Sequence, residues 1–438
     1  MASRHGAEVD RPSYGFGERR SCPAEQQLMT RKERFRLGVN YWPARIAIGW
    51  WKDFEHSEVA SDFSTIAASG FDSVRVFLTW QDFQPARGRV DMGMLRRLLS
   101  VADLAGDSGL AIMPTLFTGH MSGVNWIPGW ALTGSDGDDR FRVVSDWRVT
   151  CAGLRNWYED PEIVRAQTLL ASEAAAALAG HQAMWAWDLG NENSNCVIPP
   201  SRSSARRWLD RVASAIRAAD NTALVTVGLH MEDLEENRLL GPLEAANVCD
   251  FLTMHGYPIY ARWAESSTDE HVLSFLAQVT SWLGGGCEIL FSEFGLPTYR
   301  SEDPKSRRAR AESEAPLVEE EDAAAYTRRA LAVLLAAGCL GAMVWCYTDY
   351  LPSIWGNPPL DSAVHERFFG LWRADGSPKP SVAAVEEFSG HDRIATADRH
   401  EWIDIDPEEF YQDPQAHLAR LYRLYRTAGG LSLHEQDG

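Results

Sequence analysis

The sequence predicts an α/β fold in which eight parallel strands close into one (β/α)8 barrel, a TIM barrel, wrapped by helices. Short apolar, β-branched segments alternate with longer segments of helical periodicity along the chain, a pattern typical of a parallel sheet covered by helices. The length of 438 residues suits one large barrel with extensions. Two of the short segments end in a glutamate, at the strand edge where such barrels place their functional groups.

The predicted strands are rich in apolar and β-branched residues, and polar or small residues end them. The fourth strand shows the pattern best, because Trp185, Trp187 and Leu189 alternate with other residues until Gly190 breaks the run. In chain order the eight strands span 35–41, 73–78, 110–117, 183–189, 223–228, 250–255, 288–293 and 341–347.

Six segments between the strands carry apolar residues at helical spacing. Two intervals do not fit the alternation of strand and helix. Residues 118–160 replace the short loop expected after the third strand, and residues 299–321 are dominated by charged side chains. For 299–321 we favour a mobile loop over a solvated face. The six helices span 59–68, 94–104, 163–178, 205–219, 272–283 and 323–336.

We predict that the chain is divided into three regions. They are a flexible leader over 1–34, the catalytic barrel over 35–390 and a C-terminal extension over 391–438. The leader is polar and lacks the apolar core of a Sec-type signal peptide. In the extension, Asp413-Pro414 predicts the start of a helix. The helix packs either on the barrel or on another subunit, so a homo-oligomer stays open. Its apolar stripe consists of Leu418, Leu421, Tyr422 and Tyr425.

Composition excludes several classes of partner. Lys and Arg total 42 and Asp and Glu total 61, a formal net charge of −19, which argues against nucleic acid and against anionic membranes. No apolar run is long enough to span a bilayer. The seven cysteines are scattered and form no Cys-x-x-Cys pair, so we expect no zinc site and a reducing, cytoplasmic location.

The two strand-ending glutamates are Glu192, which follows Asn191, and Glu293, in a Phe-Ser-Glu-Phe-Gly run. A single glutamate after a strand is often only a solvated loop carboxylate, but a pair on one barrel favours chemistry. Glycoside hydrolysis needs one carboxyl to protonate the leaving oxygen and a second as nucleophile, or as base on a water. An Arg or Tyr beside the nucleophile would keep its pKa low, whereas burial would raise the pKa of the acid.

The other strand ends and the long loop carry aromatic and polar side chains that suit a sugar site. Aromatic faces match the C–H faces of pyranose rings, and polar groups bind hydroxyls. The candidate binding residues are Arg75, His120, Trp126, Asn191, His255, Tyr257 and Trp345.

Some of these residues have a structural alternative. Arg75, inside an apolar strand, could be one half of a structural ion pair. His255 could be a satisfied core histidine, and His120 could merely anchor the long loop. Trp126 and Trp130 lie in that polar loop and are the better candidates for a sugar platform.

Four motifs together resemble clan A glycoside hydrolases, with glycoside hydrolase family 5 the nearest. The resemblance spans about residues 35–385, and it implies that Glu192 is the acid/base and Glu293 the nucleophile. The motifs are Trp-Asp-Leu-Gly-Asn-Glu at 187–192, Phe-Ser-Glu-Phe-Gly at 291–295, Val-Arg-Val at 74–76 and His-Gly-Tyr at 255–257.

The resemblance also implies places for the candidate binding residues. Arg75 and Tyr257 would flank the nucleophile, and His255 would lie near the acid/base. Asn191 would hold the hydroxyl next to the anomeric carbon. Trp345 would form the floor of the subsite that holds the cleaved sugar.

Further stretches resemble intracellular bacterial members of the exo-β-mannosidase kind. They are Asn-Tyr-Trp-Pro at 40–43, Val-Arg-Val-Phe-Leu-Thr-Trp at 74–80 and the tryptophan-containing stretch at 119–130. Because the tryptophan at the last strand end of clan A barrels is commonly followed by a cis peptide, the resemblance implies a cis bond between Trp345 and Cys346.

The sequence therefore predicts a retaining β-glycosidase that hydrolyses β-linked oligosaccharides, of β-mannosidic or a related β-1,4 type, by double displacement. We expect an exo-acting enzyme with a pocket, because the 118–160 segment and the segment after the last strand are long enough to close one end of the site. The alternatives are an endo-β-1,4-mannanase or cellulase, and a non-catalytic carbohydrate-binding barrel. No metal motif is present, so we expect no cofactor.

Overall fold

The computed structural model describes residues 34–137, 140–394 and 400–427. The leader predicted over 1–34 lies, apart from Arg34, outside the described residues.

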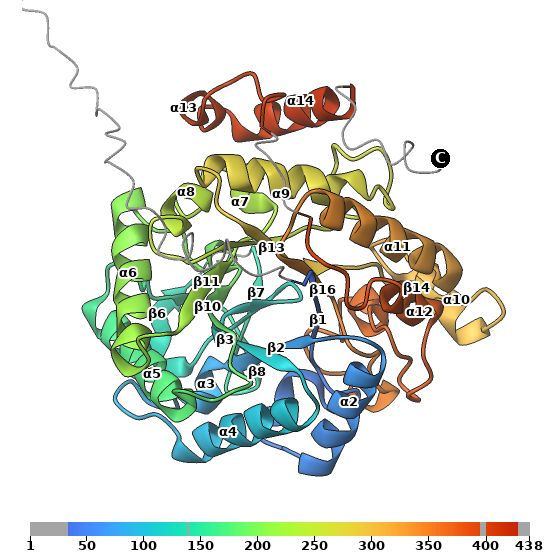
Figure 1. Ribbon diagram of the computed structural model, residues 1–438. Helices are drawn as coiled ribbons and strands as arrows, with labels where there is room; N and C mark the ends of the chain where they lie inside the picture. Colours follow the sequence, from blue (N-terminus) through green and yellow to red (C-terminus); the bar gives the residue numbers. More distant parts are fainter. Residues whose placement is uncertain (1–33, 138–139, 395–399, 428–438) are drawn as a thin grey trace, which may run out of the picture.

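Eight parallel strands form a closed barrel in which each strand pairs with its neighbours in chain order (Figure 1). The last contact closes the ring between β11 and β12, where Thr226 Oγ1 donates to the carbonyl of Phe251 at 2.9 Å and a parallel bridge joins His230 to His255. The predicted (β/α)8 fold is confirmed. The strands are β1 Arg36–Asn40, β2 Ser73–Thr79, β3 Ala111–Thr118, β10 Ala186–Asn191, β11 Leu224–Gly228, β12 Leu252–His255, β13 Ile289–Phe294 and β16 Gly341–Val344.

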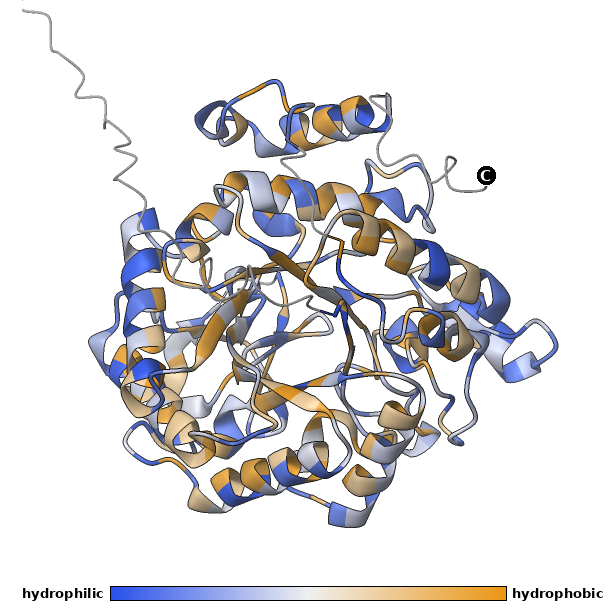
Figure 2. Cartoon of the chain, in the orientation of Figure 1, coloured by the Kyte–Doolittle hydropathy of each residue, from blue (hydrophilic) through white to orange (hydrophobic). Residues whose placement is uncertain are grey.

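Helices surround the barrel and turn apolar residues towards it and polar residues outwards (Figure 2). Capping residues mark several of their starts; for example, Asp160 accepts from the backbone N–H of Glu162, and Pro161 occupies the first turn of α5. The main helices are α2 His56–Ala68, α4 Met92–Asp107, α5 Pro161–Leu178, α6 Arg202–Ala219, α9 His271–Leu283, α11 Glu320–Ala336 and α12 Pro380–Glu386. Shorter ones are α3 Trp80–Phe83, α7 Glu232–Glu235, α8 Pro242–Ala245, η1 Ala47–Trp51, η2 Gly129–Ala131, η3 Asn193–Asn195, η4 Pro352–Ile354 and η5 Val364–Phe368.

The barrel interior is apolar near the start of the strands and polar near their ends. Gly38 of β1 leaves room there for a large neighbour, because a Cβ atom at this position would lie 2.6 Å from Cγ of Met343. A separate apolar cluster fills this end and consists of Met113, Ala186, Phe251, Leu290, Leu340 and Met343. The polar side chains gather at the carboxyl ends of the strands, where the candidate site lies.

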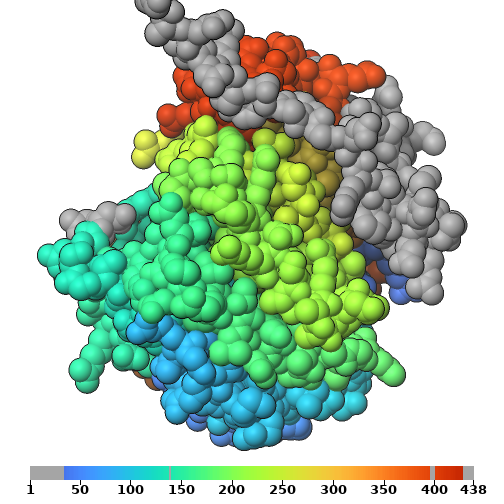
Figure 3. All heavy atoms as spheres, turned by 90° about the vertical axis from the view of Figure 1, so that its left-hand side faces the viewer, coloured from blue at the N-terminus to red at the C-terminus, as the bar shows by residue number. Residues whose placement is uncertain are grey.

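The long excursion over 118–160 is built largely from short strands. It stands out from one end of the barrel as the teal segment at the left of Figure 3. One four-stranded sheet contains β4 His120–Met121, β5 Val124–Trp126, β7 Arg142–Ser145 and β8 Arg148–Thr150, and a two-stranded sheet contains β6 Leu132–Asp136 and β9 Ala152–Leu154.

The expectation that 299–321 is a mobile loop is wrong. Residues Pro304–Glu312 form helix α10, whose first turn is capped by Asp303, which accepts from the N–H of Lys305 at 3.0 Å. Charged residues on this helix have local partners, such as Arg308 and Glu312 at 2.7 Å, and such pairs stabilise a helix in water. The flanking segments are also ordered, since β14 Thr298–Tyr299 pairs with β15 Val318–Glu319.

The described part of the C-terminal extension lies outside α9, where α13 Pro407–Phe410 and α14 Pro414–Thr427 cross the surface of the barrel (Figures 1 and 3). The apolar stripe of α14 is buried. Tyr422 packs edge-on against Phe275 of α9, with ring centroids 5.0 Å apart. The helix thus packs on the barrel of its own chain. Within the described residues no helix is long and apolar enough to cross a membrane.

Candidate active site

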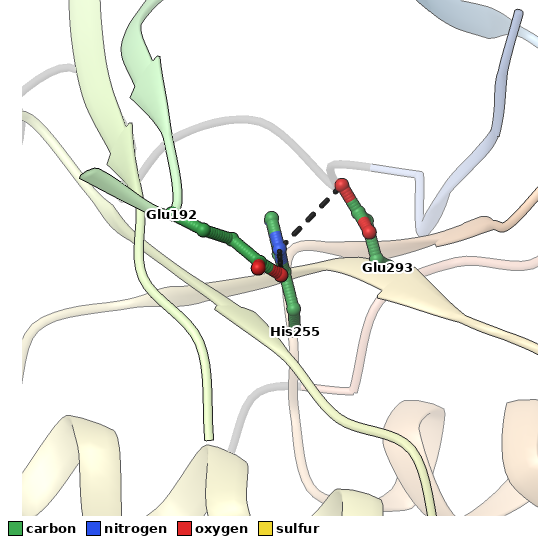
Figure 4. Close-up of side chains that lie close together, drawn as sticks. All are labelled: Glu192, His255 and Glu293. Atoms are coloured by element: carbon green, nitrogen blue, oxygen red, sulfur yellow. Dashed lines mark hydrogen bonds and ion pairs between the residues drawn. The ribbon is translucent and has the colours of Figure 1, made fainter. Parts of the chain in front are cut away.

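Glu192 and Glu293 converge at the carboxyl end of the barrel, with His255 beside them (Figure 4). Glu293 lies in β13, and Glu192 directly follows β10 in a left-handed backbone conformation with φ 48°. One oxygen of each carboxylate and one ring nitrogen of His255 all lie within 4.8 Å of one another. Two carboxylates whose nearest oxygens are this close fit the short separation of about 5–5.5 Å between the carboxyl groups of retaining glycosidases better than the roughly 6.5–9.5 Å of inverting ones.

Two donors hold the carboxylate of Glu293. Arg75 of β2, whose side chain is wholly buried, binds Oε1 through Nη1, and the hydroxyl of Tyr257 donates to Oε2 at 2.9 Å. Burial raises the pKa of Glu293 above its usual range, and His255, Arg75 and Tyr257 oppose this rise. The low pKa expected for a carboxylate beside an Arg is therefore wrong, because removal from water outweighs the favourable charges.

Arg75 is also one member of a buried ion pair with Asp188, a residue for which the sequence analysis proposed no role. Asp188 Oδ2 accepts from Nη2 of Arg75 at 2.6 Å and from the hydroxyl of Thr115 at 2.8 Å. Asn40 Oδ1 accepts from Nη1 at 3.1 Å. The sequence did hold a signal for Asp188, because a carboxylate inside an apolar strand needs a buried cation.

Side chains from two elements, β12 and η3, bond the carboxylate of Glu192. Nδ1 of His255 lies 2.9 Å from Oε1, and Nδ2 of Asn195 donates to Oε2 at 3.1 Å. His120 lies farther away, with Nε2 at 3.9 Å from Oε2. Burial raises the pKa of Glu192 above its usual range. Asn195 was not predicted; it is the third residue after Glu192, in η3.

Both histidines of the site are buried, and burial lowers their pKa values. The pKa of His255 falls to about 4, so its ring is neutral near neutral pH. Because Nδ1 faces a carboxylate oxygen, the ring proton belongs on Nδ1. Nε2 then carries none, and it has no hydrogen-bond partner among the described residues. His120 uses its Nδ1 on Oδ1 of Asn125 at 2.7 Å.

Asn191 is fixed at both ends of its amide. Its Oδ1 accepts from Nη2 of Arg75 at 2.7 Å, and its Nδ2 donates to the carbonyl of His120 at 2.7 Å. These bonds use one of the two N–H groups of the amide and leave the other for a ligand. Asn191, Arg75, His120, His255 and Tyr257 are thus all brought together around the two glutamates.

An aromatic cavity of about 410 Å³, within the range of small-ligand sites, adjoins this cluster at Trp345, although neither glutamate lines it. Trp345, Trp126, Trp42 and Trp147 line it, so two of the predicted tryptophans belong to it. Trp345 connects the cavity to the glutamates, because its backbone N–H donates to the carbonyl of Phe294 at 2.8 Å. The Trp345–Cys346 peptide bond is cis, as the resemblance implied.

The second platform candidate of the long loop, Trp130, lies elsewhere. Its Nε1 donates to the carbonyl of Gln84 at 3.0 Å, and its ring packs edge-on against Trp80 at 5.2 Å. It does not line the cavity, so the prediction of a sugar platform is wrong for Trp130. Although Trp130 lies in a polar segment, its ring packs on a neighbouring aromatic side chain and does not face the cavity.

Glu192, His255 and Glu293 also offer three ligand atoms that a metal ion could use. The charges around them do not favour one. The guanidinium of Arg75 already occupies one side of Glu293, and the ring proton of His255 points at the carboxylates. A cation there would meet a fixed positive charge and would need the histidine proton to move.

Comparison with known proteins agrees with this geometry. A family model described as cellulase (glycosyl hydrolase family 5) matches residues 35–325, more than half of the chain. An exo-β-1,4-mannosidase from Opitutaceae bacterium strain TAV5 is 26% identical with a TM-score of 0.65, and the match covers 81% of this chain and 59% of that one. A GH5_18 protein from Streptomyces cattleya, solved with Manβ1-4GlcNAc, is 22% identical with a TM-score of 0.71, over 90% and 92% of the two chains.

A mannan endo-1,4-β-mannosidase of Arabidopsis thaliana is 26% identical in an alignment over 150 residues, and the match covers 28% of this chain and 33% of that protein. The chain thus spans a third of this curated relative and somewhat over half of the Opitutaceae protein. The family model itself covers every barrel strand except β16, including the two strands that position the glutamates. The chain therefore belongs to glycoside hydrolase family 5.

Proposed function

We propose that this protein is a retaining β-glycosidase that hydrolyses β-mannosidic linkages in oligosaccharides and releases one sugar at a time from the non-reducing end. The observation that carries the proposal is the pair Glu192 and Glu293, which bring one oxygen of each carboxylate within 4.8 Å of the other at the carboxyl end of the barrel. Two carboxyls this close favour direct attack on the sugar carbon over attack by an intervening water.

In the first step Glu293 attacks the anomeric carbon and Glu192 protonates the leaving oxygen. The bond from the anomeric carbon to that oxygen breaks, and a covalent glycosyl ester of Glu293 forms with inversion. In the second step Glu192 takes a proton from water, the water oxygen attacks the anomeric carbon, and Glu293 leaves as a carboxylate. The second inversion restores the starting configuration.

Electrostatic coupling between the two carboxyls assists the change in role of Glu192. The negative charge of each glutamate opposes ionisation of the other, and the charge of Glu192 accordingly raises the pKa of Glu293. Esterification of Glu293 removes its charge, so the pKa of Glu192 falls and its carboxylate can act as the base.

The surrounding side chains position the reactants. Arg75 and Tyr257 fix the attacking carboxylate of Glu293, and the neutral ring of His255 orients Glu192. The remaining N–H of Asn191 can bind a hydroxyl of the sugar. Trp345, at the edge of the aromatic cavity, provides an apolar face for that sugar.

Two findings support the sugar and the mode of action. An exo-β-1,4-mannosidase and an endo-acting mannan hydrolase are among the relatives, which favours β-mannosidic linkages. Exo action is favoured by the cavity, because the η1 segment, the 118–160 excursion and the segment after β16 all contribute to its wall. An endo-β-1,4-mannanase or a cellulase is the alternative, and the intact glutamates argue against a non-catalytic barrel.

A substrate panel tests the proposal. We expect the protein to hydrolyse 4-nitrophenyl β-mannoside faster than the corresponding β-glucoside and β-galactoside. With a β-1,4-mannohexaose labelled at the reducing end, we expect free mannose and labelled pentasaccharide as the first products. Early labelled di- and trisaccharides would show endo action. Preference for the glucoside would overturn the assignment of the sugar.

A further inference from the structure

A further carboxylate with little exposure, Glu366, is bonded to a residue of the wall of the aromatic cavity. It belongs to η5, in the long segment that follows β16, and is only 8% exposed. The proposed hydrolysis gives it no task. No motif in the sequence distinguishes it from the other acidic residues of its segment.

One oxygen of Glu366 is bound and the other is not. Oε2 accepts from the hydroxyl of Ser122 at 2.8 Å. Nε2 of His365 lies 3.6 Å from Oε1, which is too long for a hydrogen bond. In the part of the chain that the structure describes, Oε1 therefore has no hydrogen-bond donor.

Glu366 lies next to the aromatic cavity through its contact with Ser122. Ser122, its partner, lines that cavity together with Trp345 and Tyr350. Burial and then the charges of Glu293 and Glu366 raise the pKa of Tyr257 well above its usual range. Glu366 is thus within electrostatic reach of the tyrosine that binds Glu293, as well as of the cavity wall.

Oε1 is not closed off from solvent, so in the free protein water can donate to it, and a ligand that displaces this water must supply a donor in its place. Sugar hydroxyls are such donors. We infer that Glu366 is a specificity-determining residue that accepts a hydrogen bond from one free hydroxyl of the glycone, the sugar on the non-reducing side of the scissile bond. The inference rests on the proposed function and deepens it.

A carboxylate can accept but cannot donate, and this gives the contact a consequence for chain length. A terminal sugar offers a free hydroxyl at every position that is not part of the scissile linkage. When that hydroxyl is replaced by the ether oxygen of a further linkage, the bound chain covers Oε1 of Glu366 and leaves it unpaired. If the bound hydroxyl is the one through which a longer chain continues, Glu366 selects the end of a chain over its interior.

Monodeoxy substrates test this contact directly. We would measure kcat/KM of the wild type, Glu366→Ala and Glu366→Gln on 4-nitrophenyl β-mannoside and on its 2-, 3-, 4- and 6-deoxy forms. On the parent, Glu366→Ala should lower kcat/KM by about 10- to 100-fold, the usual value of a hydrogen bond to a charged group. For one deoxy substrate, kcat/KM of the wild type should fall by a similar factor below its value on the parent. Glu366→Ala should hydrolyse that substrate as fast as the wild type does.

The comparison is a double-mutant cycle between one side chain and one hydroxyl. The ratio of kcat/KM of the wild type to that of Glu366→Ala should be near one for a single deoxy substrate. For the other three deoxy substrates it should equal the ratio measured on the parent. Partial misfolding of a variant scales all five rates equally, so it leaves this pattern unchanged. Glu366→Gln, which keeps the shape of the side chain, should give the same pattern at smaller amplitude.

Asp361→Asn is the matched control. Asp361 lies in the same segment and, like Glu366, ties it to the 118–160 excursion, through a solvent-accessible ion pair with Arg142 at 2.8 Å. Removal of the charge of Asp361 should leave all five values of kcat/KM within about twofold of the wild type, as expected for a surface ion pair. If Glu366→Ala lowers all five rates by one common factor, Glu366 only holds the loops and the inference is overturned.

The same set of assays distinguishes failure of the role proposed for Glu366 from failure of the proposed function. The parent β-glucoside and β-galactoside are included with the wild type. Hydrolysis of the β-mannoside with equal ratios across the deoxy series overturns the role of Glu366 alone. If the wild type hydrolyses none of the three parents, the proposed function fails, and the inference fails with it.

Discussion

Arg75 is a wholly buried cation that bonds two carboxylates at once, Glu293 and Asp188. A buried charge that loses its partner is costly, by about 3–5 kcal/mol, so each of these groups depends on the others. The ion pair with Asp188 also fixes the guanidinium towards Glu293. The sequence left two interpretations open for Arg75, a structural ion pair and a site residue. Both are correct, because Arg75 pairs with Asp188 and with Glu293.

The first prediction concerns the roles of the two glutamates. Glu293→Ala should abolish turnover because no nucleophile remains, and added azide should restore it with a product of inverted configuration. Glu192→Ala should slow hydrolysis of mannobiose by about 10²- to 10⁴-fold. It should spare the first step for 2,4-dinitrophenyl β-mannoside, whose leaving group needs no proton, and azide should then give a retained glycosyl azide.

Glu288→Ala is the control for that experiment, because Glu288 precedes the same strand at its opposite end and pairs with Arg393. Its activity should match the wild type. The assignment of acid and nucleophile would be reversed if the Glu192 variant, and not the Glu293 variant, gave the inverted azide.

The second prediction is a pH shift. As the proposed nucleophile, Glu293 must be ionised to attack, so its titration sets the acid limb of kcat/KM; Glu192 must be protonated, so its titration sets the basic limb. The hydrogen bond from Tyr257 lowers the pKa of Glu293. Tyr257→Phe should therefore move the acid limb to higher pH, with a loss of about tenfold or more at the optimum.

Tyr260→Phe serves as the matched variant, since Tyr260 packs beside Tyr257 with ring centroids 5.8 Å apart. No hydrogen bond within the described residues joins it to either glutamate. Its acid limb should stay in place. A profile for Tyr257→Phe that is lower but not shifted would mean that the tyrosine acts on packing and not on the charge of Glu293.

The third prediction is that no divalent cation takes part. Exhaustive dialysis against EDTA should leave kcat and KM unchanged, because the Arg75 guanidinium supplies the positive charge beside Glu293. Loss of activity that zinc or magnesium restores would show instead that Glu192, His255 and Glu293 hold a metal.

At the scale of elements, the sequence was informative where one signal was strong and misleading where two signals conflicted. All eight barrel strands were predicted within a few residues, because apolar runs ending in polar residues mark buried parallel strands. Over 299–321 the dense charges pointed to a loop. The Asp303-Pro304 pair, a helix start like Asp413-Pro414, pointed to a helix, and the capping geometry prevailed.

The short strands of the 118–160 excursion were not predicted at all. Their pairings join residues of one strand to a segment well along the chain, as in Trp126 opposite Val144, and each strand is only two to five residues long. Such strands carry too few residues for a period to be recognised. Two consequences at the site were missed with them, the packing of Trp130 on Trp80 and the contact of Ser122 with Glu366.

The fourth prediction concerns the C-terminal helix. Leu421 of α14 is fully buried against the barrel, so Leu421→Ala should lower the free energy of unfolding by about 2–5 kcal/mol. Because α14 lies outside α9 and away from the barrel strands (Figure 1), kcat/KM of the folded protein should not change. Thermal unfolding followed by circular dichroism measures the loss, and Arg423→Ala, on the exposed side of the helix, should have little effect.

A fall in activity of Leu421→Ala at a temperature where the variant is fully folded would contradict this separation. It would mean that α14 and α9 transmit strain to β12, which carries His255.

At the scale of the whole molecule, the barrel brings together residues that lie far apart in the chain. Glu192 and Glu293 are 101 positions apart in number, and they follow or end the fourth and the seventh strand of the ring. The closure of eight strands fixes the width of the barrel mouth, and so fixes the distance that the two side chains must span. The sequence predicted which carboxylates would meet, but their spacing depends on the closed ring.

The last prediction follows from that spacing. Because one oxygen of Glu192 and one of Glu293 lie within 4.8 Å of each other, we expect Glu293, and not a water, to attack the sugar from the face opposite the leaving group. Hydrolysis of 4-nitrophenyl β-mannoside followed by proton NMR should therefore show the β-anomer of mannose first, and the α-anomer should appear only as the sugar mutarotates. The measurement must be completed within the first minutes, before mutarotation mixes the anomers. If the α-anomer forms first, the reaction proceeds by a single displacement, and Glu293 acts as a base on water and not as the nucleophile.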